Sequence, residues 1–110
     1  MICDQHIHTT ISDGSDTFES VLYQAKKLGI AAVTFTNHDT TRGLDEAIRA
    51  GEAIGIHVEG GIEVSAWDPH RERKVHVLGW ALPSTHLHWN RFVLPYCRRA
   101  MRILVGRWID

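Results

Sequence analysis

Short apolar runs alternate with amphipathic stretches along the first half of this chain, and this alternation most restricts what the chain can fold into. The run 30–36 is rich in β-formers and almost uniformly apolar, as expected for a parallel strand covered on both faces. Amphipathic stretches flank it at 18–28 and 44–54, and a glycine follows each of them. Strands that alternate with helices predict β-α-β units, and therefore an α/β fold with mainly parallel strands.

Both predicted helices have an apolar face. The first is expected to start at a capping box formed by Asp16 and Glu19. Its buried face is predicted to hold the apolar residues that recur at helical spacing: Phe18, Val21, Leu22, Ala25 and Leu28. The second helix is expected to bury a smaller set: Ala47, Ile48 and Ile54.

The remaining sequence predicts three more strands and a third helix. Strands are expected at 1–8, 56–66 and 75–81, and the polar turn 68–74 makes the last two a hairpin-like pair. Beyond Pro83 the pattern changes to a C-terminal amphipathic helix with a row of arginines, which is interpreted as a solvated face. We therefore divide the chain into a portion 1–82 and a helical segment 83–110.

Composition excludes several classes of protein. The net charge of -1 gives no reason to expect nucleic acid or an anionic membrane as partner. There is neither a run of 18 apolar residues nor a signal-peptide pattern, so we expect a cytoplasmic protein with no membrane contact. The two cysteines, Cys3 and Cys97, are predicted to be small core residues rather than a disulfide.

Eight histidines are an excess that favours metal chemistry, and two of them open the chain. His6 and His8 are two residues apart on the first predicted strand, so their side chains point to the same face. Asp13 follows in the exit loop, where Gly14 is expected to turn the chain with a positive φ. Imidazoles combined with carboxylates suit Zn, Mn or Fe better than Ca or Mg alone.

Residues of ligand type also accompany the later strands. His38 and Asp39 follow the second strand, Glu63 lies in the third and His76 in the fourth. Functional groups of parallel sheets collect at the carboxyl ends of strands, so these side chains are predicted to share one site at the strand ends. Taken singly, each histidine could be a hydrogen-bonded core residue, and His57 and His70 are interpreted as exposed bystanders.

Four strings carry a resemblance to a known family: HIHTTISDG (6–14), LGIAAVTFTNHDT (28–40), GIEVS (61–65) and VHVLG (75–79). In order and spacing they resemble the amino-terminal half of the PHP (polymerase and histidinol phosphatase) superfamily, and especially its small metal-dependent phosphoesterases. The resemblance implies a distorted seven-stranded β/α barrel. A chain of 110 residues would supply only an incomplete barrel, because closed β/α barrels typically need ~250 residues.

The resemblance also implies roles for individual residues. By position, six of them resemble metal ligands for two or three divalent ions (Mn, Zn or Fe): His6, His8, Asp13, His38, Glu63 and His76. Glu63 would bridge two ions, and Asp4 and Asp39 would orient the imidazoles. Asp13 and Glu63 are thus catalytic candidates too, and Arg42 is a candidate phosphate contact, with a solvated loop arginine as the alternative. Asn37 stands where family members most often carry aspartate.

The implied function is hydrolysis of a small phosphate monoester, such as a nucleotide, through a metal-activated water. Family members supply a further histidine and an Asp-x-His pair downstream, and neither His86 nor His88 has a matching context. The alternative is therefore a non-catalytic metal-binding or self-assembling fragment that lacks these ligands. Open sheet edges predict a homo-oligomer, and a nuclease remains a third, lower-ranked interpretation.

Overall fold

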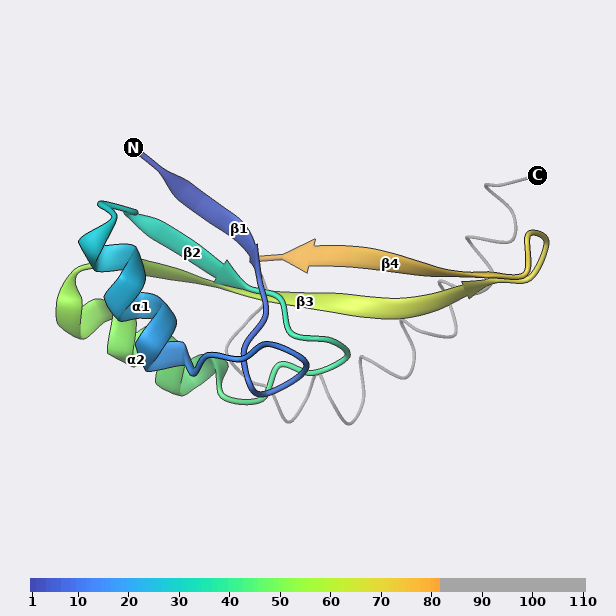
Figure 1. Ribbon diagram of the computed structural model, residues 1–110, viewed down its shortest axis with the longest axis horizontal. Helices are drawn as coiled ribbons and strands as arrows, with labels where there is room; N and C mark the ends of the chain where they lie inside the picture. The colour runs from blue at the N-terminus through green and yellow to red at the C-terminus, as the bar shows by residue number, and fades with distance from the viewer. Residues whose placement is uncertain (82–110) are drawn as a thin grey trace.

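The computed structural model describes residues 1–81, so the predicted C-terminal helix and Cys97 lie outside the described residues. The elements follow in the order β1 (Cys3–Ile7), α1 (Phe18–Lys27), β2 (Ala32–Phe35), α2 (Leu44–Ile54), β3 (His57–Asp68) and β4 (Arg73–Trp80). Both helices lie on the same side of the sheet, next to the part of it that contains β2 (Figure 1). The α/β class is confirmed, and α2 has the predicted bounds.

The four strands form one sheet in the order β1-β2-β3-β4. β1 and β2 pair in parallel, as do β2 and β3, whereas β3 and β4 are antiparallel. The long strand β3 changes partner along its length: residues 57–60 pair with β2 and residues 61–68 pair with β4. The parallel part of the sheet and the hairpin are therefore joined through one continuous strand, as Figure 1 shows.

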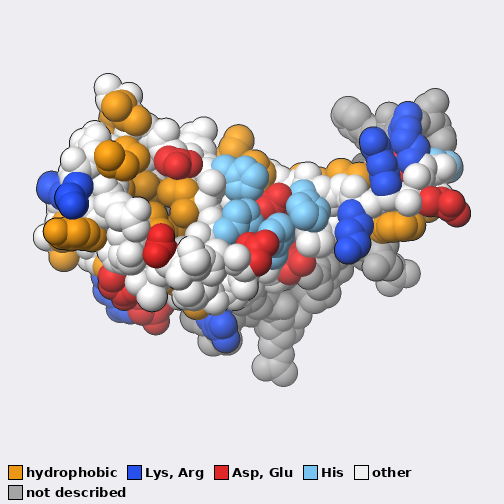
Figure 2. Space-filling model, in the orientation of Figure 1, with side chains coloured by type: hydrophobic (Ala, Val, Ile, Leu, Met, Phe, Trp, Pro, Cys, Tyr) orange, Lys and Arg blue, Asp and Glu red, His pale blue; other side chains and the backbone are white. Residues whose placement is uncertain are grey.

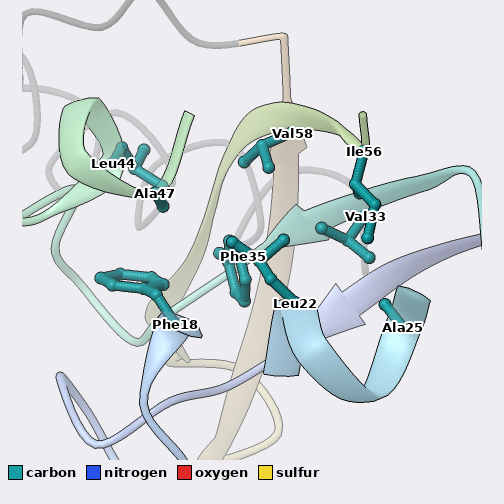
Figure 3. Close-up of a cluster of buried hydrophobic side chains, with 9 residues drawn as sticks. All are labelled: Phe18, Leu22, Ala25, Val33, Phe35, Leu44, Ala47, Ile56 and Val58. Carbon is teal, nitrogen blue, oxygen red and sulfur yellow. The ribbon is translucent and has the colours of Figure 1, made fainter. Parts of the chain in front are cut away.

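The core lies between the two helices and strands β2 and β3 (Figure 3). Among residues 1–81 this cluster contains nine buried side chains: Phe18, Leu22, Ala25, Val33, Phe35, Leu44, Ala47, Ile56 and Val58. The rings of Phe18 and Phe35 meet edge to face with centroids 4.7 Å apart, a favoured aromatic geometry. Gly51 brings α2 close to β3, because a Cβ at this position would lie 2.4 Å from Val58 Cγ2. Apolar burial on these faces holds the helices against the sheet.

Three predictions of local environment were wrong. Thr17, not Asp16, caps α1, and its hydroxyl accepts a hydrogen bond from the Ser20 amide at 3.2 Å. Leu28 is 70 % exposed and Ile54 38 % exposed, because they occupy the ends of their helices, beyond the reach of the core. Cys3 is exposed, since it opens β1, a strand whose residues are nearly all exposed.

The hairpin is longer than the sequence pattern predicted. β3 extends to Asp68 and β4 begins at Arg73, which leaves only 69–72 as the turn. The buried Asp68 carboxylate accepts hydrogen bonds from the backbone amides of His70 and Arg71 and so closes the turn locally. Neither helix within residues 1–81 has the length and apolar character needed to cross a membrane.

Candidate metal centre

Four imidazoles surround the carboxylate of Glu63. Glu63 Oε2 lies 2.7 Å from His8 Nε2, 3.1 Å from His6 Nε2 and 3.7 Å from His38 Nε2. The other oxygen, Oε1, lies 3.1 Å from His76 Nδ1. Glu63 is buried, while His8 and His38 are half-buried and His6 and His76 are exposed. The histidines form a patch on the surface with carboxylates among them (Figure 2).

The sheet topology explains this convergence. The carboxyl ends of β1 and β2 lie at the same edge, which places His6, His8 and His38 together. A backbone bridge joins His38 to Glu63. Glu63 and His76 lie in the middle of their strands, so the expectation that all ligand-type residues end their strands was wrong. Because β3 runs past the ends of β1 and β2, its middle is level with those ends.

Asp13 joins the cluster from the loop after β1. Its Oδ2 lies 3.2 Å from His38 Nε2 and its Oδ1 lies 3.4 Å from His8 Nδ1. Gly14 does not have the predicted positive φ. Glycine is required at position 14 because there is no room for a side chain: a Cβ there would lie 2.5 Å from the His8 carbonyl oxygen. The loop can therefore fold tightly over the end of β1 and bring the carboxylate back to the imidazoles.

Burial of Glu63 disfavours its charged form and acts to raise its pKa. The hydrogen bond with His6 and the positive charge that His38, His8 and His6 carry when protonated act in the opposite direction. Their combined effect is larger, so the pKa of Glu63 lies below its usual value. Glu63 is thus a carboxylate at neutral pH, the form that binds a cation.

In the described part of the chain the ligand atoms form three overlapping groups. Within each group all atoms lie within 4.8 Å of one another. The groups are His6, His8 and Glu63; His8, Asp13 and His38; and His38, Glu63 and His76. His8, His38 and Glu63 each belong to two groups. A set in which neighbouring groups share ligands is suited to more than one ion, and nitrogen with carboxylate oxygen suits Zn, Mn or Fe.

Asn37 holds the loop that carries two of these ligands. Its buried Oδ1 accepts hydrogen bonds from the Thr9 amide at 2.8 Å, the Thr9 hydroxyl at 3.2 Å and the Ser12 hydroxyl at 2.9 Å. Thr9 and Ser12 lie between His8 and Asp13 in the sequence. The sequence argument missed both residues, although two hydroxyls placed between ligands were a usable signal.

The other predicted site residues lie around the cluster. The Asp4 carboxylate accepts a hydrogen bond from the His6 amide at 3.2 Å, and the Asp39 carboxylate accepts one from the Ser65 amide at 2.8 Å. Both carboxylates thus contact the backbone of strands that carry ligands, and orientation of the imidazoles stays a prediction. Arg42 is exposed in the loop before α2, and its phosphate contact stays a prediction as well. His57 and His70 are exposed and belong to none of the three ligand groups.

A sequence model of the PHP domain matches residues 4–94. This chain belongs to the PHP domain family. The phosphoribosyl 1,2-cyclic phosphate 1,2-diphosphodiesterase of Eggerthella lenta is 61% identical to it over 79 residues, which are 72% of this chain and 30% of the relative. The 3',5'-nucleoside bisphosphate phosphatase of Chromobacterium violaceum is 39% identical over 77 residues, or 69% of this chain and 26% of the relative.

Solved structures agree with the family assignment. An amidohydrolase from Chromobacterium violaceum with bound sulfate and no metal superimposes with a TM-score of 0.74 at 30% identity, covering 97% of this chain and 34% of that protein. A candidate metal-dependent phosphoesterase from Bifidobacterium adolescentis gives a TM-score of 0.72 at 36% identity, covering 93% and 34%. The chain thus spans about a third or less of the length of these relatives.

Proposed function

We propose that the cluster around Glu63 is the metal centre of a phosphoester hydrolase that uses two or three divalent ions of Mn, Zn or Fe. The proposed ligands are the six residues that converge there: His6, His8, Asp13, His38, Glu63 and His76. The observation that supports this most strongly is one buried carboxylate contacted by four imidazoles. Imidazoles gathered around a carboxylate are the donor set that Zn, Mn and Fe prefer.

The spacing of the donor atoms fits a metal. Atoms bound at about 2.1 Å and at right angles around one ion lie about 3 Å apart. His6 Nε2, His8 Nε2 and Glu63 Oε2 have mutual distances of 3.1, 2.7 and 3.1 Å. His8 and His38 stack with ring centroids 4.4 Å apart, which restrains the orientation of both imidazoles. The site therefore already has the donor types and the spacing that a divalent cation needs.

In this proposal the residues of the chain have distinct tasks. Divalent ions, when bound, supply Lewis acidity and lower the pKa of a water ligand. Glu63 directs Oε2 toward His6 and His8 and Oε1 toward His76, so its two oxygens would be available to hold more than one ion. Asn37 holds the loop that carries Asp13. Arg42 is proposed to neutralise the phosphate oxygens of the substrate.

The proposed substrate is a small phosphorylated metabolite such as a nucleotide. The names of two relatives, the cyclic phosphate diphosphodiesterase and the nucleoside bisphosphate phosphatase, support small phosphate esters. The Escherichia coli 5'-3' exoribonuclease Rnm is 32% identical over 91 residues, and its name supports a polynucleotide as the competing substrate.

Metal content and phosphate release test the proposal together. The 110-residue chain, His8→Ala and the control His57→Ala are each loaded with Mn, Zn or Fe and dialysed, and bound metal is counted. Phosphate release is then measured on monoesters, and nucleotide release is measured on a short RNA. We expect bound metal and turnover in the parent and in the control, and loss of both in His8→Ala. Equal metal content and equal turnover in His8→Ala would reject the site.

A second candidate function is a metal-binding module that assembles with another copy of the chain. The exposed strand β1 supports it, because within residues 1–81 this strand pairs only with β2 and offers its other edge. Light scattering on the metal-loaded protein separates the two functions. Bound metal in a folded oligomer without turnover supports assembly alone, whereas turnover excludes a purely structural role.

A further inference from the structure

The hairpin face that carries Glu63 and His76 continues outward beyond the metal centre. In an antiparallel pair, opposed residues share a face, and so does every second residue along each strand. The register places Ser65 opposite His76 and Trp67 opposite Lys74. Trp67 and Lys74 therefore lie on the same face as the metal centre, two residues beyond the pair Ser65 and His76.

The exposure of β3 agrees with this assignment of faces. Val64, Ala66 and Asp68 are buried, whereas Ser65 and Trp67 between them are exposed. Trp67 is 42 % exposed, so part of its indole ring is accessible to a ligand. The outer part of the face therefore presents an indole to solvent in line with the metal centre.

Lys74 adds an uncommitted positive charge beside this ring. It is exposed, and no hydrogen bond or ion pair to its ammonium group occurs in the described part of the chain. The neighbouring Arg71 and Arg73 differ, because both guanidinium groups lie 3.7 Å from the buried Asp68 Oδ2. Lys and Arg side chains follow the histidine patch along the hairpin in Figure 2. Among residues 1–81, Lys74 is thus the cation at this end of the hairpin that is available to an anion, since Asp68 pairs with both arginines.

We infer that Trp67 and Lys74 form an outer binding site for the substrate, in which the indole stacks on a nucleobase and the ammonium binds a second phosphate. The inference rests on the proposed function, since it puts the reacting phosphate at Glu63 and His76. Lys74 lies two residues from His76, or about 7 Å along the strand. A sugar phosphate without a base offers nothing for the indole to stack on, whereas a nucleobase joined to two phosphates offers a partner to both side chains.

Binding measurements on the 110-residue chain test this inference without requiring turnover. The probes, titrated by calorimetry into the metal-free protein so that none is hydrolysed, are adenosine 3′,5′-bisphosphate, ribose 5-phosphate and a short RNA. The variants are Trp67→Leu, which removes the aromatic face, and Lys74→Gln, which removes the charge. The matched controls are Tyr23→Leu and Lys27→Gln, an exposed aromatic and lysine that contact each other on α1, 5.5 Å from ammonium to ring centroid.

We expect each hairpin variant to weaken bisphosphate binding about ten-fold, the size of one lost base stack or charge-assisted contact. Binding of ribose 5-phosphate, Mn²⁺ content and thermal unfolding should match the parent, as should every value for the α1 controls. RNA that binds more tightly than the bisphosphate and loses affinity in the same variants identifies an RNA end as the ligand. The reverse preference identifies a free nucleotide.

Two results would overturn the inference: no binding of the bisphosphate by the parent, or equal affinity in the parent and both hairpin variants. An equal loss of ribose 5-phosphate binding would do the same, because it would indicate general damage to the site. Failure of the proposed function looks different. It would appear as metal binding without phosphate release, while the difference in nucleotide affinity between parent and variants remained measurable.

Discussion

At the scale of single residues, the site depends on the Glu63 carboxylate, which lies within contact distance of four imidazoles. Glu63 is buried, and its two oxygens divide the four histidines between them. Burial alone would favour the protonated acid, but the hydrogen bond with His6 and the surrounding histidines keep the pKa low. A single carboxylate therefore organises ligands from several parts of the chain.

Replacing this carboxylate with an amide of the same size tests its role. Glu63→Gln keeps the volume and one acceptor oxygen but removes the charge that a cation needs. We expect bound Mn or Zn to fall at least ten-fold, measured by elemental analysis after dialysis, because carboxylate ligands must be ionised. The circular dichroism spectrum should match that of the parent. Full metal retention by this variant would show that Glu63 is not a ligand.

Asn37 offers a second test at the residue scale. Asn37→Ala leaves the buried Thr9 amide and hydroxyl without this acceptor and removes one of the partners of the Ser12 hydroxyl. We expect the free energy of unfolding to fall by about 1–3 kcal/mol, the cost of leaving buried polar groups unsatisfied. Urea denaturation measures the change. Asn37→Asp is the matched control, since it keeps an acceptor oxygen, and an equal loss in both variants would contradict the hydrogen-bond explanation.

At the scale of elements, the metal centre depends on the hairpin returning to β1. Trp80, at the end of β4, donates a hydrogen bond from Nε1 to the Gln5 carbonyl at 3.0 Å. β1 carries His6 and β4 carries His76, on opposite sides of Glu63. This hydrogen bond therefore joins two strands that are not neighbours in the sheet order, and it sets the distance between their ligands.

Removing only the donor tests that link. Trp80→Phe keeps an aromatic ring but cannot donate to Gln5. We expect metal affinity to fall about two- to ten-fold, which corresponds to one ordinary hydrogen bond, while the helices and the core remain intact. Metal titration followed by calorimetry measures the change. Trp67→Phe, at the exposed tryptophan further out on β3, is the control, and an equal change in both variants would contradict a specific link through Trp80.

At the scale of the whole molecule, the cluster joins segments that are far apart in the chain. Its ligands come from β1, the loop after it, the loop after β2, and both strands of the hairpin. The apolar core, by contrast, lies between the helices and strands β2 and β3 (Figure 3). The loop with Asp13 thus depends on the site more than the helices do. A bound cation would add stability where apolar packing contributes least.

Chelation is therefore expected to destabilise the metal-loaded protein. A cation present at a hundred times its dissociation constant stabilises the folded state by about 2.7 kcal/mol, so EDTA should lower the Tm by several degrees. Acidification should act in the same direction, because imidazoles and carboxylates bind metal only when deprotonated. Differential scanning fluorimetry measures both effects. His8→Ala, which lacks a central ligand, should show no response to EDTA, and a parent that is equally insensitive would contradict the prediction.

Within residues 1–81 the sequence by itself determined which elements form, and it determined the identity of the ligand-type residues. Periodicity and a terminal glycine predicted the bounds of α2, and the hairpin followed from a polar turn between two apolar runs. The spacing of His6, His8 and Asp13 indicated a shared site before any fold was known. These features are local, because each depends on residues within a few positions of one another.

The tertiary structure decided what depends on register and on neighbours distant in sequence. Glu63 reaches the histidines from the middle of β3 because that strand extends past β1 and β2. Leu28, Ile54 and Cys3 are exposed because no packed surface covers them, although each belongs to an apolar type. A pattern shows which face of an element is apolar. Only the packing between elements shows which part of that face is covered, and which side chains meet across strands.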